Sequence, residues 1–137
     1  MARILAEVLA LVHARGLVHG GVSPSNLMAA GSVVKIADLG LGRVFQVVTT
    51  AREYWPVGGR FDAATDLYAM AATLYHLLTG VNPRTRPELK PPSGLTPGIP
   101  PGFDALLIRA LDPRPEHRFS SAHMFLDALG NLGGRTA

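Results

Sequence analysis

The sequence predicts a mainly α-helical domain of the α+β type, a helical bundle with one short β-hairpin. Apolar residues recur at helical spacing in four separate stretches, and two short apolar runs flank a turn of small residues. Apolar residues make up 47% of the chain and charged residues only 17%, which is typical of a folded globular domain. A length of 137 residues suits a single domain with its own core.

A first helix is predicted over residues 2–14, with Gly16 as its C-terminal stop. Its apolar residues follow the i, i+4, i+8 spacing of one buried face: Ile4, Leu5, Val8, Leu9 and Val12. A second helix over residues 63–78 is apolar on nearly every side, which predicts that it is the buried central helix, and Gly80 ends it.

Two more helices are predicted near the C-terminus. The first covers residues 102–111 and the second residues 120–130, with Ser120 as its N-cap. The inward side chains of the first are Phe103, Leu106, Leu107, Ala110 and Leu111. Residues 131–137 are expected to form a flexible tail.

The hairpin is predicted from residues 27–29 and 33–36, which flank Ala30-Gly31-Ser32. Residues 40–60 show no sustained periodicity and are expected to form an irregular loop. Residues 81–101 contain seven prolines, which predicts a stiff surface loop without regular structure.

Composition narrows the functional classes. The absence of cysteine excludes disulfides and thiolate metal sites. The chain shows neither a signal-peptide pattern nor an apolar run of the roughly 18 residues that span a bilayer, so a cytoplasmic location without membrane contact is expected. The net charge of +3 is spread along the chain, which favours an ordinary solvated surface over a nucleic-acid interface.

Four motifs occur in an order that resembles the C-terminal lobe of the protein kinase family, of the bacterial Ser/Thr type. They are HGGVSPSN (residues 19–26), DLG (38–40), FDAATDLYAMAATLYHLLTG (61–80) and LDPRPEHRFSSA (111–122). The resemblance runs over about residues 3–130 and implies a kinase-like C-lobe over residues 1–130, without the N-lobe. It also implies that His19 and Asp66 are structural, with Asp66 accepting backbone N–H groups of the catalytic loop.

Residues 19–26 correspond to the family's catalytic loop and depart from its pattern H-R-D-x-x-P-x-N at two positions, and from the lysine that the family usually has at the second x. Gly21 stands where the family has its catalytic aspartate, Gly20 where it has an arginine, and Ser23 where it has a lysine. The aspartate accepts or orients the proton of the substrate hydroxyl, which glycine cannot do. The resemblance therefore implies a catalytically defective domain.

A second departure concerns the A-P-E motif, which aligns with Trp55-Pro56-Val57. The family's glutamate pairs with the arginine that corresponds to Arg118, and Val57 cannot do so. Because a buried unpaired arginine is destabilising, Arg118 is expected to reach solvent or another carboxylate. Trp55 is expected to belong to the core.

Some features of a nucleotide site remain. Asn26 and Asp38 match the family's two Mg²⁺ ligands, and Met28 matches a residue under the adenine ring. Two protein ligands and half of a pocket predict weak binding of Mg²⁺ and ATP. Alternatively, Asn26 and Asp38 only cap local backbone.

Two minor readings stay open from the residues alone. Gly20 and Gly21 could form an anion-binding nest, or could merely have lost their side chains. Thr49 and Thr50 could be phosphorylated, although the arginine that would bind the phosphate is absent.

The function that the resemblance implies is a pseudokinase-type interaction module or a remnant of a Ser/Thr kinase. Leu27 and Met28 are expected to be exposed where the N-lobe would sit, so a protein partner is expected to cover that surface. One alternative is the C-terminal part of a functional ATP-dependent kinase. The other is an unrelated small helical domain with convergent motifs, which a structure without the hairpin would favour.

Overall fold

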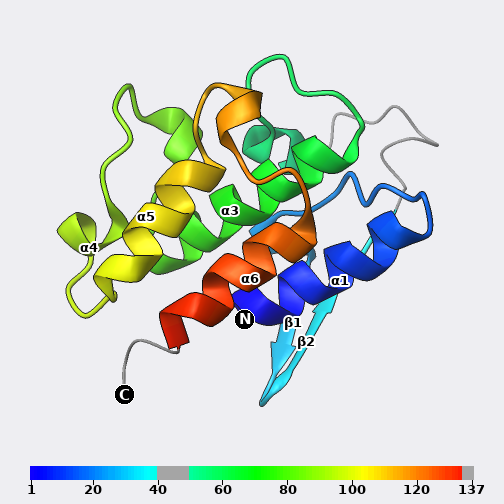
Figure 1. The fold of residues 1–137 in the computed structure, drawn as a ribbon, viewed down its shortest axis with the longest axis horizontal. Helices are drawn as coiled ribbons and strands as arrows, with labels where there is room; N and C mark the ends of the chain where they lie inside the picture. The colour runs from blue at the N-terminus through cyan, green and yellow to red at the C-terminus, as the bar shows by residue number, and fades with distance from the viewer. Residues whose placement is uncertain (40–49, 134–137) are drawn as a thin grey trace.

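The computed structural model describes residues 1–39 and 50–133, and Figure 1 shows their arrangement. Within these ranges the longer helices are α1 (Ala2–Ala14), α3 (Ala63–Thr79), α5 (Pro101–Ala110) and α6 (Ala122–Gly133), with the short α4 (Pro92–Leu95) before α5. Strands β1 (Leu27–Ala30) and β2 (Val33–Ile36) form a hairpin. The predicted fold class is therefore confirmed.

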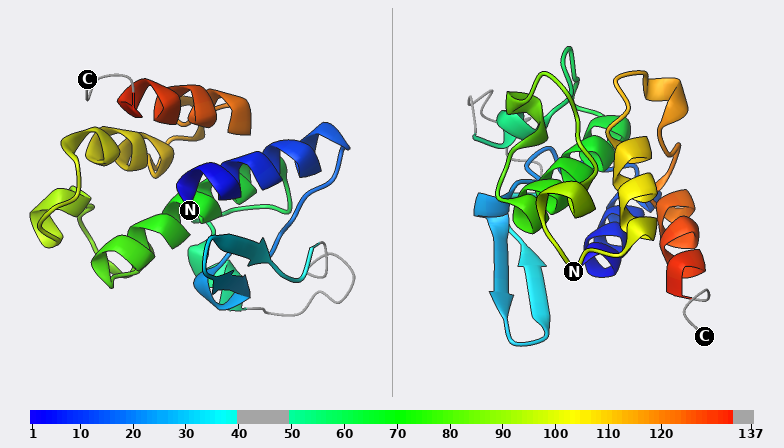
Figure 2. Two further views of the ribbon diagram at one scale, coloured as in Figure 1. Left: turned by 90° about the horizontal axis from the view of Figure 1, so that it is seen from below. Right: turned by 90° about the vertical axis from the view of Figure 1, so that its left-hand side faces the viewer.

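Helix α3 forms the centre of the bundle, as predicted, and α1 and α5 pack directly against it. Helix α6 packs across both α1 and α5, so the four long helices share one core (Figure 2). Every residue from 65 to 75 is buried. The Asp62 side chain caps the helix by accepting the Thr65 N–H at 2.8 Å, and Gly80 ends it with a φ of 75°.

Helix α1 ends as the sequence predicts. Gly16 has a φ of 68° and donates its N–H to His13, while Leu17 donates to Val12. This pair of bonds is the Schellman motif, which requires a left-handed residue that glycine adopts without strain. The chain then turns back toward α3 and enters the catalytic loop.

The hairpin pairs Leu27 with Ile36 and Ala30 with Val33 in antiparallel register. Gly31, with a φ of 60°, makes the tight turn possible. Figure 2 shows the hairpin projecting beyond the helical body. Its presence between α1 and α3 contradicts the alternative of an unrelated helical domain.

The prediction that residues 81–101 lack regular structure is wrong in part. A 3₁₀ turn, η3 (Pro83–Thr85), and helix α4 lie in this segment, and α5 begins at its last residue. Each of these elements starts with a proline. Proline favours the first position of a helix because its φ is already helical and no N–H is needed there.

Other element boundaries also differ from the prediction. Helix α6 begins at Ala122, and the Ser121 hydroxyl, not that of Ser120, accepts the Met124 N–H at 3.2 Å. The helix continues through Gly133, three residues into the predicted tail. A 3₁₀ helix, η2 (Thr50–Tyr54), lies in the predicted irregular loop, while Thr49 and Gly40 lie outside the described residues.

None of the helices in residues 1–39 and 50–133 is both long enough and apolar enough to cross a bilayer.

Candidate functional site

The catalytic loop places Gly21 in contact with the side chain of Asn26 and the backbone of Asp38. A Cβ atom added to Gly21 would lie 3.2 Å from Asn26 Nδ2, 3.4 Å from the Asp38 carbonyl oxygen and 3.5 Å from His19 Cε1. None of these three nearest atoms is a carboxylate oxygen. These three atoms therefore do not supply the carboxylate that Gly21 lacks.

Asn26 is held in place by the loop that it follows. Its Nδ2 donates to the Gly21 carbonyl at 2.7 Å, and its own carbonyl accepts the Ala37 N–H at 2.8 Å. Because the amide nitrogen is committed to the loop, the amide oxygen is the atom that can serve as a ligand. The side chain therefore does cap local backbone, but this leaves its metal-binding atom available.

Asp38 is exposed at the end of the hairpin and has a φ of 63°. It is the one non-glycine residue with a positive φ in the described ranges. Such a conformation stores backbone strain and is found preferentially at functional sites. A carboxylate and one amide oxygen suit Mg²⁺ chemically, but no group of three His, Cys, Asp or Glu residues in the described part could hold a metal ion more firmly.

Asp66 anchors the catalytic loop to α3. Its carboxylate, almost completely buried, accepts the N–H groups of His19 and Gly20 at 2.8 Å each. His13 on α1 also lies 2.9 Å from it through Nε2. The predicted structural role of Asp66 agrees with this geometry, and His13 is a partner that the sequence did not reveal.

These bonds argue against the anion-binding nest. The Gly20 N–H is used by Asp66, and the Gly21 N–H donates to His19 Nδ1 at 3.1 Å. Neither N–H group is free to bind an anion. The alternative reading, a simple loss of side chains, is the one that fits.

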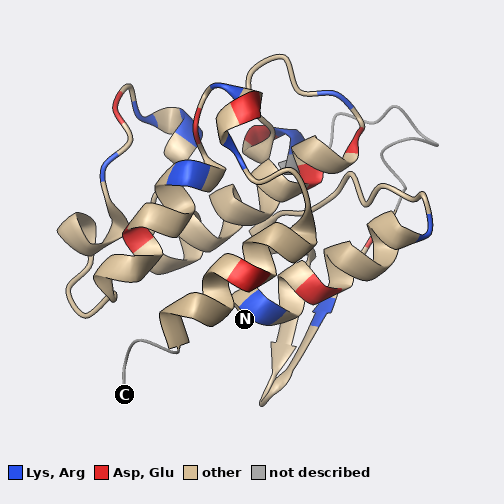
Figure 3. Ribbon diagram, in the orientation of Figure 1, with Lys and Arg blue, Asp and Glu red and all other residues tan. Residues whose placement is uncertain are grey.

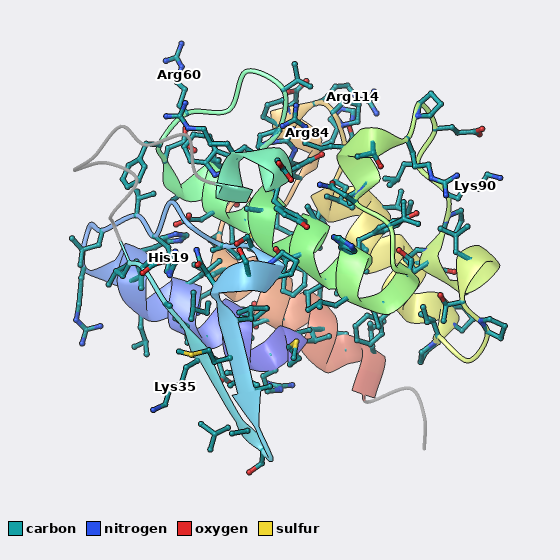
Figure 4. The ribbon with its side chains drawn as sticks, turned by 180° about the vertical axis from the view of Figure 1, so that it is seen from behind. His19, Lys35, Arg60, Arg84, Lys90 and Arg114 are labelled. Atoms are coloured by element: carbon teal, nitrogen blue, oxygen red, sulfur yellow. The ribbon has the colours of Figure 1, made fainter. Side chains whose placement is uncertain are left out.

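His19 is buried under the loop, with 1% of its surface exposed. Burial lowers its pKa, and this effect outweighs the opposite influence of the Asp66 and Asp38 carboxylates. Its Nε2 has no hydrogen-bond partner in the described part of the chain. Figure 4 shows His19 between the hairpin and the helical body, which fits the predicted structural role.

The other two positions at which the loop differs from the family, Gly20 and Ser23, are both packed closely against neighbouring residues. Gly20 has a φ of 72°, and a Cβ atom there would overlap the Phe61 ring. The Ser23 hydroxyl is fully buried and hydrogen-bonds the Ser25 hydroxyl at 3.0 Å. Neither position can present a positive charge to a phosphate group.

Arg118 is only partly buried and so reaches solvent, which is one of the two outcomes predicted for it, but no carboxylate among the described residues is its direct partner. The guanidinium is partly buried, donates to the carbonyls of Asp112 and Pro113 at 2.6 and 3.2 Å, and stacks over the Tyr68 ring at 4.8 Å. Backbone carbonyls and an aromatic face thus replace the expected carboxylate. Burial also lowers the pKa of Arg118. Val57 is 90% exposed and has no carboxylate that could pair with Arg118.

The exposed apolar side chains are partly as predicted. Met28 is 57% exposed, and Val33 across the hairpin and Leu39 after it are exposed as well. Leu27, expected to be exposed, is instead partly buried against the core. Trp55 is buried, as expected.

This fold, with a loop anchored to a central helix and followed by a hairpin, is like that of the C-terminal lobe of protein kinase domains. The chain is similar to the crystal structure of the Mycobacterium tuberculosis PknI kinase domain, with a TM-score of 0.75 and 29% identity. The match covers 97% of this chain and 53% of that one. No protein family model matches the chain.

The curated proteins that are similar in sequence to this chain are also bacterial protein kinases. The serine/threonine-protein kinase PknB of Mycobacterium tuberculosis is 30% identical over 143 residues, which cover 85% of this chain and 23% of PknB. A probable serine/threonine-protein kinase of Streptomyces coelicolor is 31% identical, over 96% of this chain and 24% of that protein. The chain is a homologue of bacterial serine/threonine protein kinases, and it spans about a quarter of the length of these relatives.

Proposed function

We propose that this kinase-like domain acts by binding and not by phosphate transfer, as a pseudokinase-type module. The observation that carries the proposal is the bare backbone at Gly21, with no carboxylate among its nearest side-chain contacts. Phosphate transfer in kinases depends on positioning and on a residue that orients the attacking hydroxyl. Gly20 and Ser23 remove two further charged groups from the same loop.

Binding of a nucleotide is expected to be weak. Asn26 Oδ1 and the Asp38 carboxylate would hold Mg²⁺, which would supply charge neutralisation for the phosphates. Met28 would lie beneath the adenine ring, yet more than half of its surface is exposed. The residues thus fit the cofactor chemically without enclosing it.

The partner that we propose is an N-terminal kinase lobe, seated on the surface formed by Met28, Val33 and Leu39. All three side chains are at least half exposed and lie on the projecting hairpin or just after it. The chain spans about half of the PknI kinase domain, and a complementary lobe of that domain type would cover apolar groups of this kind.

Incubation of the purified chain with ATP, Mg²⁺ and a generic basic protein substrate tests the catalytic part. We expect no phosphate transfer above a protein-free blank. Turnover that a mutation of Asp38 to Asn abolishes would refute the proposal, because contaminating kinases would not respond to that change.

Size-exclusion chromatography with light scattering tests the partner. With a separately expressed N-terminal half of the PknI kinase domain, we expect a one-to-one complex that Met28→Lys and Val33→Lys together abolish. Leu77→Lys is the matched control, because Leu77 is similarly exposed on α3. Self-association of this chain alone, sensitive to the same pair of mutations, would show that a second copy covers the surface and would contradict the proposed partner.

A second function is favoured by the geometry of Asn26. Its bond to the Gly21 carbonyl keeps the amide oxygen available as a ligand, which a purely degenerate loop would not need to preserve. The chain would then be the C-terminal part of an ATP-dependent kinase that works through an unusual base. Transfer by a protein that includes both lobes distinguishes the two functions.

A further inference from the structure

A positively charged pocket lies beside the segment that leads into α3. It has a volume of about 390 Å³ and is lined by Arg52 on η2, Arg60 just before α3 and Arg84 on η3. None of its described lining residues is acidic. Pockets that bind small ligands have roughly 300–1,000 Å³, so its size allows more than a single inorganic ion.

Two of the three arginines are held in place. The Arg52 guanidinium lies over the Trp55 ring, 5.2 Å from its centre, and the Arg84 Nη1 donates to the Arg52 carbonyl at 3.0 Å. The Arg84 N–H in turn donates to Asn82 Oδ1 at 3.0 Å. Because these contacts already restrict the side chains, less conformational entropy would be lost when a ligand binds.

The third arginine is available to a ligand. Arg60 is exposed, and its side chain makes no hydrogen bond or ion pair within the described part of the chain. Figure 4 shows Arg60 and Arg84 along the same edge of the molecule, at the opposite side from Lys35 on the hairpin. The pocket therefore lies on a different surface from the one proposed for the N-terminal lobe.

The backbone between the arginines forms a tight turn. Gly58 has a φ of 71°, and a Cβ atom at Gly59 would lie only 2.9 Å from the Pro56 carbonyl oxygen. Both positions require glycine, the first for its left-handed conformation and the second for space. The turn fixes the position of Arg60 relative to Trp55.

The neighbouring acids do not neutralise the pocket. Asp62 follows Phe61, but its carboxylate caps α3 through the Thr65 N–H. Glu53 lies on η2 without lining the pocket. Figure 3 shows basic and acidic segments interspersed along this edge, so the pocket is a local excess of positive charge and not part of a wholly basic face.

We infer that this pocket binds a phosphorylated serine or threonine side chain of a partner polypeptide. The planar fork of arginine matches phosphate oxygens with paired hydrogen bonds, and three guanidiniums suit a dianion. Trp55 and Phe61 also line the pocket and offer apolar contact to the residues beside the phosphate. The inference goes beyond the proposed function, because such a pocket would operate whether or not the chain transfers phosphate.

The chain carries its own probe of this pocket. Trp55 is its single tryptophan and lines the site, so intrinsic fluorescence reports binding there. The chain would be titrated with a short peptide that carries a central phosphothreonine, with the same peptide containing threonine or aspartate instead, and with inorganic phosphate. We expect a saturable change with the phosphopeptide alone at micromolar concentrations.

Arg60→Gln together with Arg84→Gln should weaken phosphopeptide binding at least tenfold, and Arg60→Gln alone should weaken it measurably. The single variant keeps the test decisive if the double variant folds poorly, since the Arg60 side chain has no hydrogen bond or ion pair to lose among the described residues. Arg3→Gln, on the exposed part of α1, is the charge-matched control and should bind like the unmodified chain.

Three results would overturn the inference. The first is the absence of a saturable fluorescence change, and the second is equal binding by the Arg60→Gln and Arg3→Gln variants. The third is equal binding of inorganic phosphate or of the aspartate peptide, which would indicate a free-anion or general acidic site. None of these measurements involves ATP, so failure here leaves the catalytic proposal untouched.

Discussion

The Phe61 ring occupies the space into which any side chain at Gly20 would extend. Phe61 comes just before α3 and packs against the core, while Gly20 lies in the catalytic loop with a φ of 72°. The two residues form one packing unit across 41 positions of sequence. Gly20 therefore lacks the arginine side chain of the family, and the Phe61 ring fills the space that such a side chain would need.

Gly20→Ala is expected to lower the free energy of unfolding by about 2 kcal/mol or more, from overlap with Phe61 added to a strained φ. Gly80→Ala is the control, because Gly80 has a φ of 75° with no atom within 4 Å of an added Cβ. It should lower stability by only about 1 kcal/mol. Urea denaturation followed by circular dichroism measures both.

The same contact predicts a specific rescue. In a double-mutant cycle, Phe61→Ala combined with Gly20→Ala should be less destabilising than the sum of the two single changes, by roughly 0.5–3 kcal/mol. Strict additivity would contradict the packing described here.

Asp66→Asn should lower the free energy of unfolding by about 3 kcal/mol, because an amide cannot accept both buried N–H groups of the loop as a carboxylate does. Asp62→Asn is the matched control on the same helix. Asparagine caps helices as well as aspartate, so this change should have little effect. Equal effects of the two changes in urea denaturation would disprove the anchoring role of Asp66.

Arg118→Lys is expected to lower stability by about 1 kcal/mol, since an ammonium group cannot reproduce the two carbonyl contacts and the stacking over Tyr68. Arg114→Lys is the comparison, because Arg114 is exposed and pairs with Asp112 at the surface. Surface pairs contribute little, and no measurable change is expected there. A larger thermal shift for Arg114→Lys than for Arg118→Lys would contradict this account.

The stability of the domain should fall as the pH drops below about 6.5, the ordinary pKa of histidine. Burial lowers the pKa of His19 in the folded chain, so the unfolded chain binds the proton more readily in this range. One such group changes the free energy of unfolding by at most about 1.4 kcal/mol per pH unit.

Urea denaturation between pH 7 and pH 5 would measure the His19 effect as the difference between the unmodified chain and His19→Asn, whose Oδ1 can still accept the Gly21 N–H. His123→Asn serves as the exposed control. An unchanged slope in His19→Asn would contradict the assignment.

The sequence predicted the elements whose signals are local. Three such signals lie within a few residues of the element that they predict. They are the apolar periodicity of α3, the glycines at the ends of α1 and α3, and the small residues at the turn of the hairpin. Prolines misled the prediction for residues 81–101, because the same residue that breaks a helix interior also favours a helix start.

The parts of the site that the sequence could not predict depend on packing between distant segments. The contact of His13 with Asp66 joins residues 53 positions apart, and the motif around Asp66 gives no sign of it. Arg118 was expected to reach solvent or another carboxylate, and the sequence did not reveal that two backbone carbonyls near Asp112 accept hydrogen bonds from its guanidinium. The missing carboxylate at Gly21, in contrast, could be predicted from the sequence alone, because glycine has no side chain in any structure.

The most direct test of the central claim is phosphate transfer by a fusion of the N-terminal half of the PknI kinase domain to this chain. Thermal unfolding would first confirm that the fusion folds, and transfer would then be compared with and without Gly21→Asp and Ser23→Lys. The account predicts no transfer above the blank for the unmodified fusion and measurable transfer after the two changes. Transfer by the unmodified fusion at the level of the intact PknI kinase domain would contradict it.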